Sequence, residues 1–279
     1  MMTQWAFAAP IALCAIATGL IGSLTGLGGG FILVPLLTLA FGVDIRYAIG
    51  ASLVAVIATS SGSAAAYLRQ GFPNVRIAMF LEIGSTTGAL AGAAIASYLP
   101  ASAIAVIFGF VLLHSAYHSI RAHKAAPPTA GEDRLARYFG MESTYPTPSG
   151  TVSYGVHGVA LGFVLMIVAG ILSALLGIGS GIVKVLALDR VMGLPFKVST
   201  TTSNFMIGVT AAASAGVYFG RGYIQPALAM PVALGVLGGS FMGGRILPGA
   251  KTRRLRLLFS TVLVAVATYM IYKGVAGRI

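Results

Sequence analysis

The sequence predicts an all-α polytopic membrane protein made of two inverted-topology repeats of about five segments each. The 279-residue chain is 57% hydrophobic and 9% charged, whereas soluble domains carry about 25% charged residues. Its apolar runs approach the roughly 20 residues that an α-helix needs to cross a bilayer. The second half also repeats the glycine pattern of the first half 151 residues later.

The apolar runs divide into two sets of five, separated by a polar stretch that is rich in charged residues and proline. We therefore predict a first transmembrane repeat over residues 1–120, a cytoplasmic linker over 121–151 and a second repeat over 152–279. The expected segments are 6–24, 31–41, 47–68, 77–98 and 101–120, followed by 152–176, 182–193, 198–219, 225–247 and 254–272.

The two halves match without gaps at an offset of 151 residues for about 70 residues. A single glycine match is weak evidence in a glycine-rich chain, but an unbroken register across three segments favours an internal duplication over compositional bias. The matched pairs include Gly26, Gly28 and Gly30 with Gly177, Gly179 and Gly181, Tyr67 with Tyr218, and Gly84, Gly88 and Gly92 with Gly235, Gly239 and Gly243.

The positive charges favour inverted over parallel repeats. If the short segments 31–41 and 182–193 carry the chain across, thirteen of the 18 lysines and arginines lie on one side and Lys184 stays within a span. The other side receives Arg46, Arg221, Lys273 and Arg278. Re-entrant short segments would give parallel halves with almost no charge bias. Because positive charge collects in the cytoplasm, we expect a cytoplasmic linker and extracytoplasmic termini in the cell (inner) membrane.

Two glycine-rich stretches, GLGGGFILVP (26–35) and GIGSGIVKVL (177–186), interrupt this apolar pattern. Glycine disfavours helix interiors and adopts positive φ readily, so we expect the helix to break there and a short helix to follow. The unpaired amides of a helix start favour an anion. We predict a substrate site that includes Gly28, Gly29, Gly30, Gly179, Ser180 and Gly181. The alternative is that these glycines only let helices pack closely.

A lysine and a glutamate interrupt otherwise apolar spans. An ionisable residue within the membrane indicates function by default, so we predict that Lys184 attracts or neutralises an anion. The alternatives are an ion pair or a side chain that reaches the interface. Glu82 is the strongest candidate partner for Lys184, or a carrier of a coupling proton. Ser203 and Asn204, which follow closely after the second break, complete the predicted substrate site.

Several functions are disfavoured. The net charge of +12 is explained by loops that orient membrane helices and contact lipid, so nucleic acid is not an expected partner. No GxxxxGK[ST] nucleotide-binding loop is present, and no nucleophile and base are arranged for catalysis. His114 and His118 lack a third ligand nearby. We therefore expect neither an enzyme nor a bound metal or cofactor.

The duplicated halves, the two glycine-rich stretches and ATSSGSAAAYLRQGFPN (58–74) resemble the TauE/SafE family across essentially the whole chain. The resemblance implies a secondary carrier that exports sulfite, sulfoacetate or a related organosulfonate anion. The second repeat has Ser180 in place of a glycine and Leu186 where Pro35 stands, so the two half-sites are not equivalent. An anion channel, or a carrier for another small anion, is the alternative. The coupling ion and oligomeric state stay open.

Overall fold

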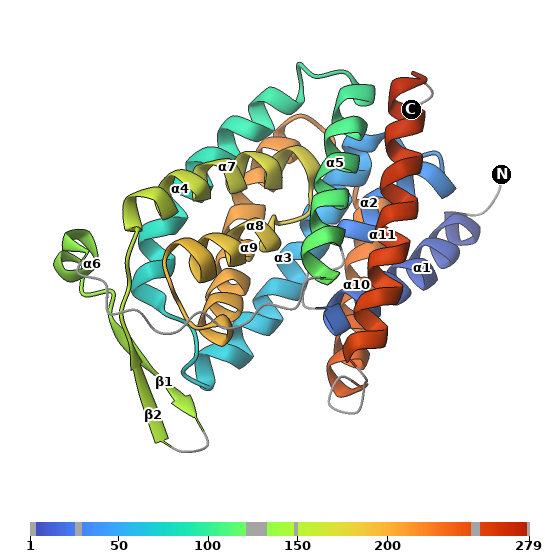
Figure 1. Ribbon diagram of the computed structural model, residues 1–279. Coiled ribbons are helices and arrows are strands. Elements are labelled where there is room, and N and C mark those ends of the chain that lie inside the picture. Colours follow the sequence, from blue (N-terminus) through green and yellow to red (C-terminus); the bar gives the residue numbers. More distant parts are fainter. Residues whose placement is uncertain (1–3, 26–29, 121–132, 148–149, 247–251, 278–279) are drawn as a thin grey trace.

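The computed structural model describes residues 4–25, 30–120, 133–147, 150–246 and 252–277, which are predominantly helical, as predicted (Figure 1). The first half contains α1 (Gln4–Thr25), α2 (Gly30–Ala40), α3 (Ile45–Arg69), α4 (Val75–Ala96) and α5 (Ala101–Ile120). The second half contains α7 (Val159–Leu176), α8 (Gly181–Leu186), the π-helix η1 (Ala187–Val191), α9 (Phe196–Gly220), α10 (Pro226–Ile246) and α11 (Thr252–Val275).

The backbone leaves the helix between α7 and α8. Gly177 has a φ of 65° and Gly179 a φ of 72°, values that glycine reaches without a steric penalty. Ser180 also lies in the left-handed region, with a φ of 42°, where residues with a side chain are uncommon. A new helix then begins at Gly181. Of the first glycine-rich stretch, only Gly30 onward belongs to the described residues, so Gly28 and Gly29 lie outside them.

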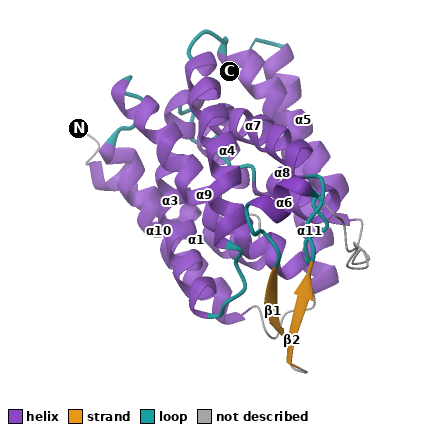
Figure 2. Ribbon diagram, turned by 90° about the vertical axis from the view of Figure 1, so that its left-hand side faces the viewer, coloured by secondary structure: helices purple, strands orange, loops and turns teal. Residues whose placement is uncertain are grey.

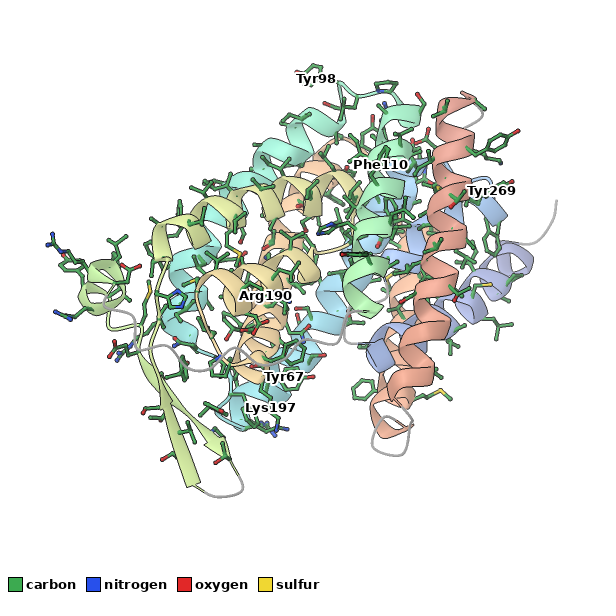
Figure 3. The ribbon with its side chains drawn as sticks, in the orientation of Figure 1. Tyr67, Tyr98, Phe110, Arg190, Lys197 and Tyr269 are labelled. Atoms are coloured by element: carbon green, nitrogen blue, oxygen red, sulfur yellow. The ribbon has the colours of Figure 1, made fainter. Side chains whose placement is uncertain are left out.

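The helices of the two halves pack in pairs across the molecule: α1 packs on α10, α4 on α7, α3 on α9 and α5 on α11. Helices α3 and α9 run antiparallel. The rings of Tyr47 at the start of α3 and Tyr223 just after α9 lie 5.5 Å apart. At the other end, the Nζ of Lys197 at the start of α9 lies 5.5 Å from the ring centre of Phe72. Figure 3 shows Tyr67 and Lys197 at one end of the molecule and Tyr98 at the other.

Glycines allow the backbones of paired helices to touch. A Cβ added to Gly88 on α4 would overlap the carbonyl oxygen of Ile167 on α7. A Cβ added to Gly239 on α10 would overlap the carbonyl oxygen of Ile16 on α1 in the same way. Gly88 and Gly239 differ by 151 in number, and so do Ile16 and Ile167. Helices α4 and α7 therefore meet at the positions that correspond to those at which α10 and α1 meet. Small residues commonly permit such close approach between membrane helices.

The outer faces of the helices are apolar. Among the described residues, α3, α4 and α7 are long and apolar enough to cross a membrane by length and composition. Large hydrophobic side chains point outward from α4 and α7, including Met79, Ile83, Leu90, Leu161, Val164 and Val168. Exposed apolar surface of this extent is unusual for a soluble monomer and fits contact with lipid.

The stretch between the halves differs from the all-α prediction. It contains the short helix α6 (Arg134–Tyr138) and an antiparallel hairpin of β1 (Ser143–Thr147) and β2 (Gly150–Tyr154). The hairpin projects from the helices in Figure 2. Threonine, valine and tyrosine favour strands over helices, which explains the hairpin. Strand β2 also runs past residue 151, where the sequence analysis ended the linker.

The hairpin and α6 are fixed to the helices by polar contacts. The Nδ2 of Asn74, at the start of α4, donates to the Met141 carbonyl at 2.8 Å and to the Tyr154 hydroxyl at 2.9 Å. The Asp133 carboxylate accepts from the backbone amides of Val159, at the start of α7, and Leu135, each at 2.9 Å. The Val159 amide is the main cause that lowers the pKa of Asp133. The hairpin and α6 are therefore an ordered part of the fold that packs against the helices.

The glycine contacts predict a selective effect of added methyl groups. Gly88→Ala should destabilise the protein by about 1–3 kcal/mol, because the methyl group pushes α4 away from α7. Gly216 is the control, since it is exposed on α9 and a Cβ there would meet nothing within 4 Å. Gly216→Ala should leave the protein unchanged or stabilise it by up to about 1 kcal/mol. Thermal unfolding in detergent measures both, and equal midpoints for the two variants would contradict the contact.

Candidate functional site

A lysine is buried inside the helical assembly. Lys184 lies on α8, three residues after that helix begins, and its amide donates to the Ser180 carbonyl at 3.1 Å. Its side chain has no solvent-exposed surface. Because α8 packs against α9, the ammonium group cannot reach water and must find its partners inside the protein.

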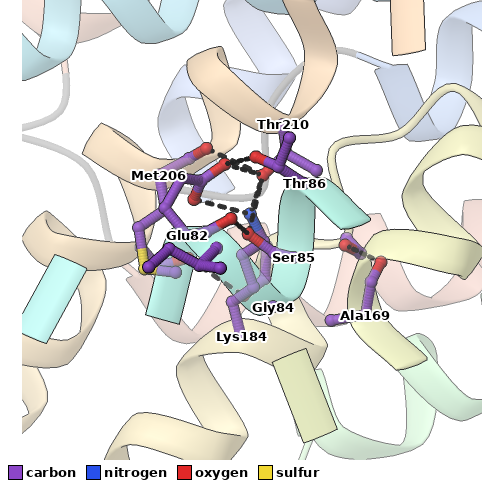
Figure 4. Close-up of polar contacts among 12 residues, drawn as sticks. Glu82, Gly84, Ser85, Thr86, Ala169, Lys184, Met206 and Thr210 are labelled. Carbon is purple, nitrogen blue, oxygen red and sulfur yellow. Dashed lines mark hydrogen bonds and ion pairs between the residues drawn. The ribbon is translucent and has the colours of Figure 1, made fainter. Parts of the chain in front are cut away.

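The partners of Lys184 come from two other helices (Figure 4). Its Nζ donates a hydrogen bond to the Thr210 hydroxyl on α9. The same Nζ lies 3.7 Å from Oε2 of Glu82 on α4, and the side chain of Glu82 is 9% exposed. The structure thus shows the ion pair that the sequence analysis gives as the alternative for Lys184, with Glu82, its strongest candidate partner. Attraction of an anion by Lys184 stays a prediction. The first and second halves of the chain each supply one charge.

The two carboxylate oxygens of Glu82 have different surroundings. Oε1 accepts from Thr210 at 2.6 Å and from Thr86 at 3.1 Å. Oε2 is buried without a hydrogen-bond partner among the described residues, and only the charge of Lys184 compensates it. Thr86 lies one helical turn from Glu82, so the two side chains share a face of α4. We call Glu82, Thr86, Lys184 and Thr210 the charged cluster.

The charged cluster occurs in only one of two related places. At the offset of 151, Lys184 corresponds to Leu33, Glu82 to Ala233 and Thr210 to Thr59. Leu33 is fully buried, like Lys184. Helices α2 and α10 therefore carry apolar residues where α8 and α4 carry a cation and an anion, while α3 and α9 both carry a threonine. The same helix packing does not require the ion pair, which argues against a purely structural role for it.

The start of α2 meets the break before α8. A Cβ added to Gly30 would lie 2.9 Å from the carbonyl oxygen of Gly177 and 3.2 Å from the Cα of Ile178. The hydroxyl of Ser52 on α3 donates to the same Gly177 carbonyl at 2.7 Å. Irregular backbone at membrane depth is tolerated only where other groups satisfy it. Here a side chain from the first half satisfies the broken backbone of the second.

The other predicted site residues also contact the second break. The Ser180 hydroxyl donates to the Ala169 carbonyl at 2.6 Å, and the Ser203 hydroxyl points to the Gly181 carbonyl at 3.4 Å. Added Cβ atoms on Gly179 and Gly181 would each press on the side chain of Ile207. The backbone carbonyl of Asn204 accepts from Ser60 on α3. These contacts bring α3, α9 and the second break together.

The predicted residues form two groups. Gly30, Gly179, Ser180, Gly181 and Ser203 gather at the second break. The Lys184 amine instead meets α9 at Thr210, seven residues beyond Ser203, which is about 10 Å along a helix.

Sequence reasoning missed Thr210 as a member of the site. The sequence analysis predicted Ser203 and Asn204 on α9 instead. Just before them, the hydroxyls of Ser199, Thr200 and Thr201 bond to nearby backbone carbonyls of α9 or its N-terminal flank. The one available signal for Thr210 is its equivalence to Thr59 across the offset of 151. That match identifies a repeated hydroxyl but not its ionic partner.

The apolar helices and the buried charged cluster are features of a membrane transport protein. A family model described as "Sulfite exporter TauE/SafE" matches residues 11–270. The chain therefore belongs to the sulfite exporter TauE/SafE family.

Similar curated proteins carry transporter names. "Probable membrane transporter protein YunE" of Bacillus subtilis is 29% identical over 269 residues, which cover 93% of this chain and 96% of that protein. "Probable membrane transporter protein YdhB" of the same organism is 27% identical and covers 84% of this chain and 88% of its own length. A "Probable membrane transporter protein" of Xylella fastidiosa is 25% identical, with coverages of 94% and 95%. No solved structure matches the chain.

The charged cluster predicts strong coupling between Lys184 and Glu82. Lys184→Leu or Glu82→Ala alone should cost about 3–5 kcal/mol, because each leaves one buried charge without its partner. The double variant copies Leu33 and Ala233 of the other half and should recover much of that loss. Thermal unfolding of all four proteins in detergent gives the interaction energy. Additive losses in the double variant would contradict the pairing.

Proposed function

We propose that the protein is a secondary transporter that exports a small anion, such as sulfite, sulfoacetate or a related organosulfonate, by alternating access. The observation that carries the proposal is the ion pair of Lys184 and Glu82, which is buried between the two halves and is replaced by apolar residues at the related place. A buried cation in a membrane protein commonly marks the path of a charged substrate.

Alternating access is supported by features expected of inverted repeats. Helices α3 and α9, which correspond at the offset of 151, pack antiparallel through their opposite ends. Helices α5 and α11 do the same, since Gly274 at the end of α11 approaches Ser102 at the start of α5. Inverted repeats let one half rock against the other around a central site.

The contacts at the helix ends support the proposed orientation. Arg46 donates to the Leu99 carbonyl and Arg221 to the Ala93 carbonyl. Both contacts lie at the C-terminal end of α4, so Arg46 and Arg221 lie at the same end of the molecule. They are two of the four cations that the inverted arrangement places outside. Lys197, which contacts Phe72, belongs to the cytoplasmic set. We therefore propose a cytoplasmic linker and extracytoplasmic termini in the cell membrane.

The proposed substrate site extends from the place where Gly30 meets the second glycine-rich stretch to the Lys184 amine, about 10 Å further along α9. Its proposed lining is Gly30 of the first stretch and Gly179, Ser180 and Gly181 of the second. Gly28 and Gly29, which lie outside the described residues, stay predicted members of the site. Ser203 and Asn204 of α9 add polar groups. Lys184 supplies the positive charge that offsets the anion, and Glu82 holds that charge when no anion is bound. A small oxyanion is suitable because it accepts several hydrogen bonds in a small volume.

The choice of a sulfur oxyanion rests on the family description, which names sulfite export. The names of the similar curated proteins specify a membrane transporter and no substrate. An anion channel remains the competing proposal, because helices broken at membrane depth also occur in selectivity filters. A carrier saturates with substrate and exchanges it, whereas a channel conducts at rates far above those of a carrier.

Flux measurements in proteoliposomes test this function. We expect saturable exchange of sulfite or sulfoacetate, in a panel that also includes taurine, sulfate and chloride. Lys184→Ala should lower the rate at least about tenfold, a factor equivalent to 1.4 kcal/mol, while the protein stays inserted. Lys197→Ala is the control, because Lys197 is an exposed lysine at the start of α9. Normal flux in Lys184→Ala would remove Lys184 from the site, and ohmic currents would favour the channel.

A further inference from the structure

We propose that Glu82 is the proton-binding site of this transporter, and that a proton travels in the same direction as each monovalent anion. The anion replaces the Glu82 carboxylate as the counter-charge of Lys184, and that carboxylate binds the proton. This inference rests on the proposed transport function and adds its coupling ion and stoichiometry.

The charge balance of the cluster carries the first step. Lys184 and ionised Glu82 together have no net charge, and both side chains are at least nine-tenths buried. A monovalent anion that enters would leave one uncompensated negative charge inside the protein, which is strongly unfavourable away from water. Protonation of Glu82 removes that charge. Binding of the anion and binding of the proton therefore favour one another.

The hydrogen bonds of Glu82 identify where the proton goes. Oε1 is occupied by the hydroxyls of Thr210 and Thr86, whereas Oε2 has no hydrogen-bond partner in the part of the chain that the structure describes. A carboxylic acid needs only one oxygen to carry its proton. A proton on Oε2 therefore breaks none of the hydrogen bonds at Oε1 and removes only the attraction to Lys184. The Glu82 side chain can stay in place as it changes charge.

The position of Lys184 suits a change of partner. Its Nζ is 3.7 Å from Oε2, beyond the range of an N–H···O hydrogen bond. Thr210 accepts its hydrogen bond instead. An ammonium group has three N–H donors, and Thr210 requires one of them. The remaining donors can turn to the oxygens of an anion without loss of the Thr210 contact, so Lys184 is held in place and can still bind.

Within the described residues, one titratable side chain, that of Lys184, is shown in contact with Glu82. Helix α4 packs against α7 and α9. Phe163 and Ile167 of α7 lie against the glycines of α4, and α9 presents the Thr210 hydroxyl. Lys184 of α8 is the charged group at contact distance.

Asp189 and Arg190 follow on η1, five and six residues after Lys184. Asp189 is buried to the same extent as Glu82, at 7% exposure, which makes it a matched control.

The repeat supports a single proton for each transport cycle. Ala233 and Leu33 stand where a second copy of Glu82 and Lys184 would be, so each chain has one such site. When one proton accompanies a monovalent anion, no net charge crosses the membrane. The transmembrane potential then contributes nothing, and the direction follows the sum of the anion and pH gradients. Export occurs when the outward gradient of the anion is larger than the opposing gradient of protons.

Proteoliposomes loaded with methanesulfonate and an internal pH dye test the inference. Methanesulfonate is a suitable probe because its charge stays at −1 across the pH range of transport. With the membrane potential clamped, efflux of methanesulfonate through the native protein should raise the internal pH. About one proton should leave with each anion, since the cluster stays neutral. A ratio near zero would overturn the inference, and this measurement on the native protein requires no variant to fold.

The variant Glu82→Gln provides the second measurement. Glutamine resembles the protonated acid, so anion efflux should persist, the proton-to-anion ratio should fall to near zero, and the rate should become sensitive to the potential. Asp189→Asn should keep the native ratio. A Glu82→Gln protein that still moves about one proton per anion would contradict the assignment.

The same experiment separates the two proposals. Efflux of methanesulfonate without protons leaves the proposed transport function standing and overturns only the role of Glu82. Failure of the native protein to move methanesulfonate, sulfite and sulfoacetate contradicts the proposed function, and the coupling inference falls with it.

Discussion

The structure depends on one constraint: polar groups removed from water must find partners inside the protein. The break between α7 and α8 is compensated by side chains from other helices. Ser52 of the first half bonds to the Gly177 carbonyl, and Ser203 of α9 points to the Gly181 carbonyl. The same constraint pairs Lys184 with Glu82. Because Ser52 and Glu82 belong to the first half, the second break and the charged cluster also hold the two halves together.

The two halves use one packing plan but carry different chemistry. Glycines at equivalent positions bring α4 onto α7 and α10 onto α1, so the framework is nearly symmetric. The charges are not, since Leu33 and Ala233 occupy the places that correspond to Lys184 and Glu82. In the function that we propose, the duplicated framework serves alternating access, and the change in one copy supplies the site for the anion. In this account, the charges that occur in only one of the two copies make the transporter selective for an anion.

Much of the fold could be predicted from the sequence, because apolar length and a repeated register are local signals. The same signals located the break at Gly177–Ser180, where positive φ favours glycine. They could not locate Thr210 in the cluster, since its partners Glu82 and Lys184 lie on other helices. The hairpin at 143–154 was missed because a short strand pair in a polar stretch carries little periodic signal and is fixed by contacts such as those of Asn74.

The central claim is that two oppositely inserted halves enclose one charged cluster, and membrane topology tests it most directly. Single cysteines at Tyr98, Lys197 and Gln225, on a background with Cys14→Ser, would be labelled in intact cells with a thiol reagent that cannot cross the membrane. All three positions are exposed. Inverted halves predict labelling at positions 98 and 225 from outside and protection at 197. Labelling that groups 98 with 197, and opposes both to 225, would show parallel halves and contradict the account.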